Sequence, residues 1–499
     1  MSNFRVIFSR KSSESSELEE DNRNQPLRQL AIRGGIYLFI REALGMVVRL
    51  AGLVITLRLI GPAAYGIFAG AAAFTLVVTT VAQMGGEVFL IKMPILPDRS
   101  HYNQVFTFLL VTSIAATGLA LAATWAFGGL FRPAGVLPPL RVLLLTVPVN
   151  VLWAPAQARI ERGFGYRKMG LLELGGDVAL YGTAVPLAFL GAGTWSLVIG
   201  FFMFQFWLLV GSYVLSGLRL RLRWSKSTAK ELTRFGFSYS MTTWTTLLGG
   251  LINPLVVGTF LGATGVGYVA FAQRLVGTIG FAQRGANRLG LVSMSRVPDG
   301  QNDRIRRAIE EGSEFLLIAL GVPFAIFGVV ARIVIPLLFG QDWTIAIRLY
   351  TFLALAAVLS SSGFVQIAFL LSRGRNYTVA VAGAIQASVL AVASIILVRH
   401  FGIDGFGYAS LLMLIGLVFL DRATRCFVAF SYRNYCFVAA AIAPLVAFSL
   451  VPFPVSLVMA APLIVLILVP KTRREGLRQI AVIRSGLSRR RASTEEGLE

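Results

Sequence analysis

The chain has 499 residues, of which 56% are hydrophobic and only 14% are charged. Its mean hydropathy is +0.72, which excludes an ordinary soluble protein and is typical of a polytopic membrane protein. The net charge of +22 does not by itself indicate nucleic acid, because lysine and arginine collect in the cytoplasmic loops of membrane proteins. The two cysteines, Cys426 and Cys436, form neither a disulfide framework nor a metal-binding spacing.

Apolar segments of the length that crosses a bilayer follow one another along most of the chain. A polar tail precedes them, without a cleavable signal peptide, and two shorter apolar segments follow, separated by Pro452 and Pro454. We predict twelve spans and a final helical hairpin, about fourteen transmembrane helices in all. The segments are 35–60, 65–91, 103–129, 139–160, 171–191, 194–217, 235–260, 266–291, 312–339, 344–371, 377–398, 405–428, 436–451 and 454–470.

The basic residues predict the orientation of these spans. The even-numbered connections contain 23 lysines and arginines, including the cluster from Arg219 to Arg234, whereas the odd-numbered connections and their flanks contain six. We therefore expect the even-numbered loops and both termini to be cytoplasmic.

Three short motifs occur twice, in the same order, at offsets of about 200 residues. LIGPAAYG (59–66) is echoed by FLGATGVGY (260–268), RGFGY (162–166) by RGRNY (373–377), and GAGTWSL (191–197) by GFGYASL (405–411). This internal duplication predicts two six-helix bundles in the same orientation, related by a pseudo-two-fold axis. Transporters built in this way hold their substrate where the two halves meet.

The first apolar segment contains Arg41, Glu42 and Arg49. Arg41 and Arg49 fall on one stripe of a helix, and Arg49 lies near the middle of the span, where a cation costs about 2.5–3.5 kcal/mol on insertion scales. One interpretation is a salt bridge within the membrane, with Glu42 as a partner. The other, which we favour, is a helix that lines a hydrated, cationic passage.

Other polar residues within spans are candidates for function. Arg274 follows Gln273 in an otherwise apolar span and, with Arg41 and Arg49, is a candidate for binding phosphate, because arginine offers forked donors and keeps its charge. Glu42 and Asp177 are candidates for coupling transport to a proton or sodium gradient.

A hinge is predicted in the seventh span, where Pro254 follows Asn253 and frees a backbone carbonyl. Signatures of an enzyme are missing from the sequence: it contains neither a nucleotide-binding G-x-x-x-x-G-K-[ST] loop nor H-E-x-x-H. We expect no enzymatic activity, cofactor or metal.

The arginine stripe with RLIGPAAYGIFAGAAAF, LTRFGFSYS before helix seven, FLGATGVGYVAFAQRL between helices seven and eight, and LLFGQDWTIAIRLY (337–350) resemble Wzx-type polysaccharide flippases. These belong to the same superfamily as multidrug and toxin extruders (MATE), and the resemblance covers residues 30–430. It implies an all-α fold of two six-helix bundles around a central cavity that opens alternately to each side.

The resemblance also implies a function. Such proteins move undecaprenyl-diphosphate-linked oligosaccharides from the cytoplasmic to the outer leaflet of the bacterial inner membrane, for exopolysaccharide, capsule or O antigen, alongside a polymerase or co-polymerase. A lipid II flippase for peptidoglycan and a drug/cation antiporter of the same fold remain alternatives. A polytopic glycan polymerase is disfavoured, because the outer loops are short.

These predictions divide the chain into six parts. They are a flexible cytoplasmic tail (1–33), an N-terminal bundle (34–217), a basic cytoplasmic linker (218–234), a C-terminal bundle (235–430), a hairpin extension (431–470) and a basic cytoplasmic tail (471–499).

Overall fold

The computed structural model describes residues 27–93, 96–130, 135–163, 165–279 and 302–450. Within these ranges every regular element is helical, so the predicted all-α class is confirmed. The expected span 454–470 and the tail 471–499 lie outside the described residues, as do positions 1–26 of the expected N-terminal tail.

The first half of the chain forms the N-terminal bundle. Its long first helix, α2, joins two predicted spans in one element, because the chain remains helical on both sides of a kink at Gly61. The helices are α2 (Leu27–Gln83), α3 (Gly86–Lys92), α4 (Arg99–Ala126), α5 (Leu137–Leu144), α6 (Thr146–Leu152), α7 (Ala154–Arg162), α8 (Tyr166–Phe189) and α9 (Thr194–Ser216), with a short 3-10 turn at Gly128–Leu130.

The second half forms the C-terminal bundle and one further helix. Its elements are α10 (Lys226–Ile252), a π-helical turn at Asn253–Val257, α11 (Gly258–Ile279), α13 (Asn302–Phe339), a 3-10 turn at Gln341–Trp343, α14 (Ile345–Leu359), α15 (Ser361–Ser372), α16 (Asn376–Phe401), α17 (Ile403–Leu412), α18 (Ile415–Arg425) and α19 (Arg433–Val446), which continues as a 3-10 turn at Ala447–Leu450.

Nine helical stretches within the described ranges are long and apolar enough to cross a membrane. One of them, Gly45–Gln83, covers most of the two predicted spans on either side of Gly61. Helix α8 falls outside the nine although it is 24 residues long. It carries Arg167, Lys168, Glu173 and Asp177, and these charges reduce its hydropathy.

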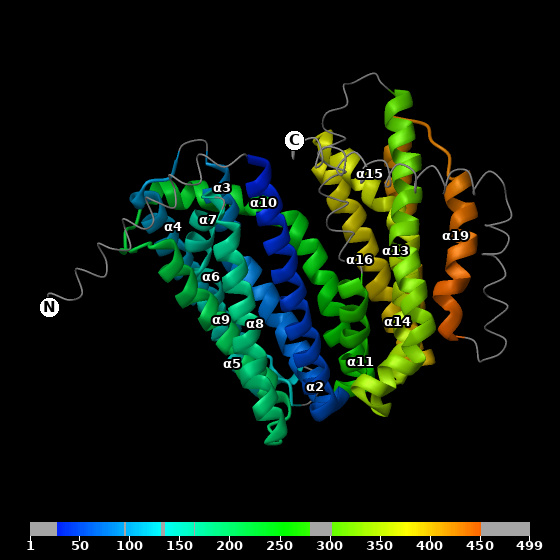
Figure 1. The fold of residues 1–499 in the computed structure, drawn as a ribbon, viewed down its shortest axis with the longest axis horizontal. Coiled ribbons are helices and arrows are strands. Elements are labelled where there is room, and N and C mark those ends of the chain that lie inside the picture. Colours follow the sequence, from blue (N-terminus) through cyan, green and yellow to red (C-terminus); the bar gives the residue numbers. More distant parts are fainter. Residues whose placement is uncertain (1–26, 94–95, 131–134, 164, 280–301, 451–499) are drawn as a thin grey trace.

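The two bundles stand side by side and form a V (Figure 1). They meet at the end where α2 turns at Gly61 and stand apart at the opposite end, which carries the basic connections such as the one before α10. Helix α19 packs on α13 at the far edge of the C-terminal bundle, so the first helix of the expected extension lies outside the two-bundle core (Figure 1).

The repeated motif gives the same backbone conformation in both halves. Gly61 has φ 73° and ψ 175°, and Gly262, 201 positions later, has φ 69° and ψ −163°. Both lie in a region of φ that residues with a side chain rarely adopt. A glycine at each kink therefore lets the chain reverse direction and continue at once as the next helix.

Helices α2 and α11 cross at Gly66 and Gly267, and the contact is reciprocal. A Cβ atom on Gly66 would lie 1.8 Å from the carbonyl oxygen of Ala263, and a Cβ on Gly267 would lie 2.0 Å from that of Pro62. Gly66 and Gly267 are 201 positions apart, and so are Pro62 and Ala263. Each contact is therefore the repeat of the other, as a pseudo-two-fold axis requires. Lipid offers helices no hydrophobic drive to associate, so backbone approach at small residues is a main source of their contact.

Aromatic side chains fill the space beside this crossing. Trp343, in the turn before α14, is buried and packs edge-on against Tyr65 of the N-terminal bundle, with ring centroids 5.9 Å apart. Its ring also contacts Tyr268 and Phe271 of α11. The crossing and this aromatic cluster close the narrow end of the V.

We predict that Gly66→Ala separates the two bundles at the narrow end, because the added methyl group would overlap the Ala263 carbonyl. Spin labels at Phe127 and Phe401, both exposed, in a background without the native cysteines, should report longer distances in this variant. Gly118→Ala is the matched control, since nothing lies within 4 Å of a Cβ there. Identical distance distributions in the two variants would contradict the prediction.

Candidate functional site

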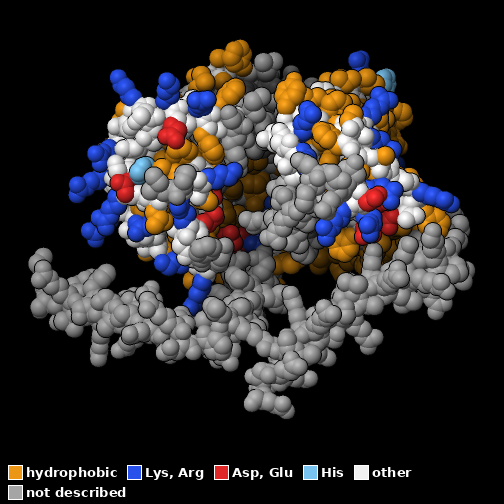
Figure 2. Space-filling view, turned by 90° about the horizontal axis from the view of Figure 1, so that it is seen from above, with side chains coloured by type: hydrophobic (Ala, Val, Ile, Leu, Met, Phe, Trp, Pro, Cys, Tyr) orange, Lys and Arg blue, Asp and Glu red, His pale blue; other side chains and the backbone are white. Residues whose placement is uncertain are grey.

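A hollow separates the two lobes at the wide end of the V. Figure 2 looks into the molecule from this side and shows the lobes apart, with hydrophobic side chains visible in the wall of the gap. Helices α2, α8 and α11 meet below this opening. They carry the charged residues that the sequence singled out.

Arg49 projects from α2 toward α8. Its Nη1 atom lies 2.9 Å from Oδ2 of Asp177, and the side chains are 35% and 10% exposed, respectively. The two helices approach closely because α2 has a glycine opposite an aromatic ring: a Cβ on Gly52 would lie 2.1 Å from the ring of Tyr181. Two candidates from different sequence arguments, Arg49 and Asp177, thus form one ion pair.

This ion pair changes the interpretation of Arg49. The structure shows Asp177, 128 positions away, as a partner of Arg49, and the expected pairing with Glu42 stays a prediction. Arg41 and Glu42 lie on the helical backbone of α2, but their side chains are outside the described part of the chain. At 1.5 Å per residue, Arg41 is about 12 Å along the helix from Arg49, toward the wide end.

Arg274 comes to the same place from the opposite bundle. It lies in α11, within the apolar stretch Gly249–Ile279, yet is exposed. Its guanidinium interacts electrostatically with Tyr65 of α2 and with Tyr181 and Asp177 of α8. A charged side chain in a span must face a hydrated space or a partner, and Arg274 has Asp177 of α8 as an oppositely charged partner.

The cluster therefore contains two guanidiniums and one carboxylate, contributed by both bundles. Among the described side chains, one carboxylate thus stands against two permanent cations, and cations are in excess. An anion with several oxygens suits such a site, because arginine donates two parallel hydrogen bonds to phosphate or carboxylate. The described residues contain no group of three or more metal-ligating side chains.

The predicted hinge coincides with an irregular turn. Residues Asn253–Val257 form a π-helix between α10 and α11, a feature that often marks functional sites. Asn253 is buried, and its Nδ2 atom donates to the carbonyl oxygen of Val266 at 3.4 Å. Pro254 faces α2, since a Cβ on Gly70 would lie 3.6 Å from the proline Cβ.

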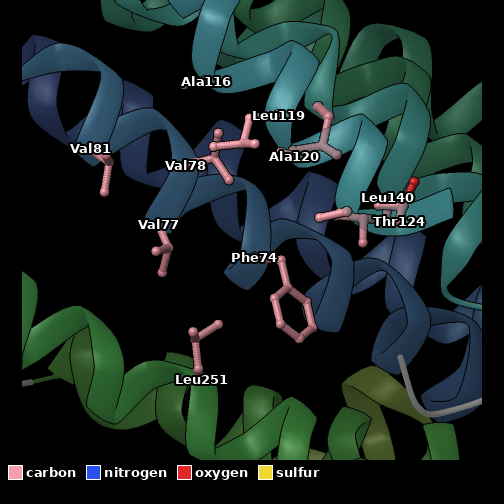
Figure 3. A pocket seen from close by; sticks show the side chains of 12 residues that line it. Phe74, Val77, Val78, Val81, Ala116, Leu119, Ala120, Thr124, Leu140 and Leu251 are labelled. Atoms are coloured by element: carbon pink, nitrogen blue, oxygen red, sulfur yellow. The ribbon is translucent and has the colours of Figure 1, made fainter. Parts of the chain in front are cut away.

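An apolar groove of about 340 Å³ opens at the seam between the bundles. Figure 3 shows its walls: Phe74, Val77 and Val78 of α2 lie on one side, with α4 and α5 beside them. Leu251 of α10 faces them from across the gap. Such a surface fits a hydrocarbon chain and has no group that would hold a charged head.

Sequence reasoning missed Tyr65, Tyr181 and the packing role of Gly52. Tyr181 follows Asp177 by four residues, so the two share one face of α8. A tyrosine one turn after an intramembrane aspartate was a signal that could have found it. Tyr65 is buried and stands in the repeated motif itself, where only the glycines drew attention.

The fold resembles solved transporters at low sequence identity. "Lipid II flippase MurJ, inward closed conformation" superimposes with a TM-score of 0.69 at 15% identity, covering 89% of this chain and 100% of that one. "Inward-facing conformation of a multidrug resistance MATE family transporter of the MOP superfamily" gives 0.63 at 17% identity, covering 78% and 98%. Both confirm the expected two-bundle, MATE-like fold.

The sequence itself identifies the family. No curated protein sequence matches the chain. A family described as "Polysaccharide biosynthesis protein", however, matches residues 55–348, more than half of the chain, including the repeated glycine motifs, Asp177 and Arg274. The chain is therefore a multi-pass membrane protein that belongs to this polysaccharide biosynthesis family, as the resemblance to Wzx-type flippases led us to expect.

Proposed function

We propose that this protein flips undecaprenyl-diphosphate-linked oligosaccharide repeat units from the cytoplasmic to the outer leaflet of a bacterial inner membrane, for exopolysaccharide, capsule or O antigen. The observation that carries the proposal is the convergence of Arg49 and Arg274 from different bundles into one hollow. The family and the transporter fold support a lipid-linked substrate.

The chemistry of such a substrate fits the two surfaces described above. Its diphosphate needs permanent cations in a hydrated space, which Arg49 and Arg274 supply, with Arg41 nearer the wide end. Its polyprenyl tail must stay in an apolar medium while the head crosses. The apolar groove beside Leu251 lies at a seam between the bundles, where a tail could leave the hollow toward lipid.

Two alternatives share this fold. A lipid II flippase would carry a substrate with the same diphosphate, so the arginines do not distinguish it. A drug/cation antiporter should place more acidic than basic groups in its cavity. The described cluster has two arginines to one aspartate, which favours an anionic substrate.

Transport would proceed by alternating access. The bundles are closed at the Gly66–Gly267 crossing and open at the wide end, which we assign to the cytoplasm because the basic connections gather there. In the state that opens to the other side of the membrane, α2 and α11 must separate at this crossing. The π-helical turn at Asn253–Val257 joins α10 to α11 and is our candidate for the hinge of that movement.

Asp177 is our candidate for coupling. While it is ionised, it holds Arg49 through the ion pair at 2.9 Å. Arrival of a diphosphate would compete for that guanidinium, and binding of a proton or cation to Asp177 would release it. A gradient could thus drive the cycle through one residue.

The first test removes the charges. Export of polysaccharide in a complementation assay should fall by about ten- to hundredfold for Arg49→Ala and for Arg274→Ala, since a hydrogen bond to a charged group contributes about 1.5–3 kcal/mol. Arg→Lys variants should retain part of the activity, because charge remains while the forked geometry is lost. Arg399→Ala, at an exposed position, is the control, and membrane abundance is measured throughout.

A purely structural Arg49 would behave differently. Its removal would take the 2.9 Å ion pair away from the buried Asp177, and the added change Asp177→Asn should then restore abundance and export together. Normal export by a stably inserted Arg49→Ala, Arg274→Ala variant would overturn the proposed site.

The second test concerns coupling. In liposomes containing the full chain, a proton or sodium gradient should accelerate flipping by the native protein, and Asp177→Asn should remove that acceleration while slower, gradient-independent flipping persists. Glu173→Gln, an exposed acidic residue on the same helix, should respond like the native protein. An unchanged response of Asp177→Asn to both gradients would exclude Asp177 as the coupling group.

The third test concerns orientation. Reporter fusions after Lys226 and after Arg433 should report the cytoplasm, and a fusion after Gly193 should report the outside, because basic residues flank the first two positions. A cytoplasmic signal at Gly193 would reverse the assignment of the wide end.

A further inference from the structure

The segment between α9 and α10 carries arginines in an unusual arrangement. Residues 218–225 contain Arg219, Arg221 and Arg223 alternating with leucines, and this stretch is not helical. In an extended chain, side chains two positions apart point to the same side. The three guanidiniums can therefore face one space, while buried Leu218 anchors the other side.

Side chains of α4 hold this segment in place. The backbone N–H of Arg221 donates to Oδ1 of Asn103 at 2.9 Å, and the N–H of Arg223 donates to Oγ1 of Thr107 at 2.8 Å. These two hydrogen bonds satisfy backbone N–H groups that, in a β-sheet, would bond to a neighbouring strand. The positions of the arginines thus depend on specific contacts with the first turns of α4.

A polar pocket of about 570 Å³ results from this arrangement. Its lining residues are Arg99, Ser100, Asn103, Arg219, Arg221, Leu222 and Arg223. Within the described part of the chain, none of its four guanidiniums pairs with a carboxylate, and neighbouring Asp98 is bonded to His101 instead. Four exposed cations around one pocket repel one another unless an anion lies between them.

The position of the pocket relative to the membrane indicates which anion it binds. Helix α9 ends at Ser216 and α4 begins at Arg99, and both are candidate membrane spans, so the pocket lies where spans leave the hydrocarbon. Trp224 and Leu222 are exposed beside it, as expected of residues at a membrane interface. Figure 2 shows basic side chains gathered along the rim of this lobe.

We propose that this pocket binds the headgroup of an anionic phospholipid in the leaflet on the basic side of the protein. Clusters of four or more basic residues beside a span favour anionic lipids, and arginine forks match phosphodiester oxygens. None of the lining residues belongs to α2, α8 or α11. The site is therefore separate from the arginine cluster in the hollow and does not depend on the proposed transport function.

Native mass spectrometry of the full chain, titrated with phosphatidylglycerol or with phosphatidylcholine, tests the proposal. Phosphatidylglycerol should bind more tightly, and the triple variant Arg219→Gln, Arg221→Gln, Arg223→Gln should weaken its binding by about 100-fold, since each basic residue near an anionic surface contributes roughly fivefold. The fold should persist, because the bonds to Asn103 and Thr107 come from the backbone.

A matched control is Arg304→Gln, Arg306→Gln, Arg307→Gln, which removes the same charge from exposed positions on α13 and should leave the phosphatidylglycerol affinity within about twofold of native. Asn103→Ala tests the geometry, since it keeps every arginine but frees the Arg221 backbone. It should also weaken binding. Equal losses in the two triple variants would show a diffuse charge effect and overturn the site.

Two other ligands could occupy the pocket, and the same titration distinguishes each of them from a phospholipid. If inorganic phosphate displaces phosphatidylglycerol when the two are present at equal concentrations, the pocket is a site for free anions and the lipid proposal fails. The acidic cluster of the N-terminal tail is the other candidate. If phosphatidylglycerol binds only after Glu14, Glu17, Glu19, Glu20 and Asp21 are changed to their amides, the tail occupies the pocket, which again overturns the proposal.

Discussion

The backbone contact between α2 and α11 is the constraint on which the other features of this structure depend. Gly66 and Gly267 bring the two helices together so closely that neither position has room for a Cβ atom. Because the helices diverge from this point, one end of the molecule is closed and the other is hollow. The same crossing fixes the distance between α2 and α11 further along, and so decides whether Arg49 and Arg274 can act on one ligand.

The electrostatics of the hollow follow from that geometry. Each arginine alone would be a costly charge within a span. Together they interact with Asp177 of α8, which offsets part of that cost. Among the described side chains, the aspartate lowers the cost of the two cations without cancelling both charges.

Much of this could be predicted from the sequence because it depends on local patterns. Apolar lengths predicted the helices, and the repeated LIGPAAYG and FLGATGVGY motifs predicted duplicated kinks, which appear at Gly61 and Gly262. The partner of Arg49 could not be predicted, since Asp177 is 128 positions away and a helical stripe defines a direction but not a neighbour. The reciprocal fit of Gly66 to Ala263 and of Gly267 to Pro62 is likewise a property of tertiary packing. Single glycines in apolar segments are too common to indicate it.

The two groups of arginines differ in their position relative to the membrane and in their neighbouring charges. Arg49 and Arg274 are isolated in apolar helices, share a carboxylate and meet only because two bundles converge. Arg219, Arg221 and Arg223 lie beyond the helix ends, where the cost of exposing charge is small and no described carboxylate competes. The first arrangement suits a ligand that must bind and leave within each cycle. The second has no described carboxylate beside it, and the phospholipid proposed above would hold the basic side of the N-terminal bundle at a fixed depth in the membrane.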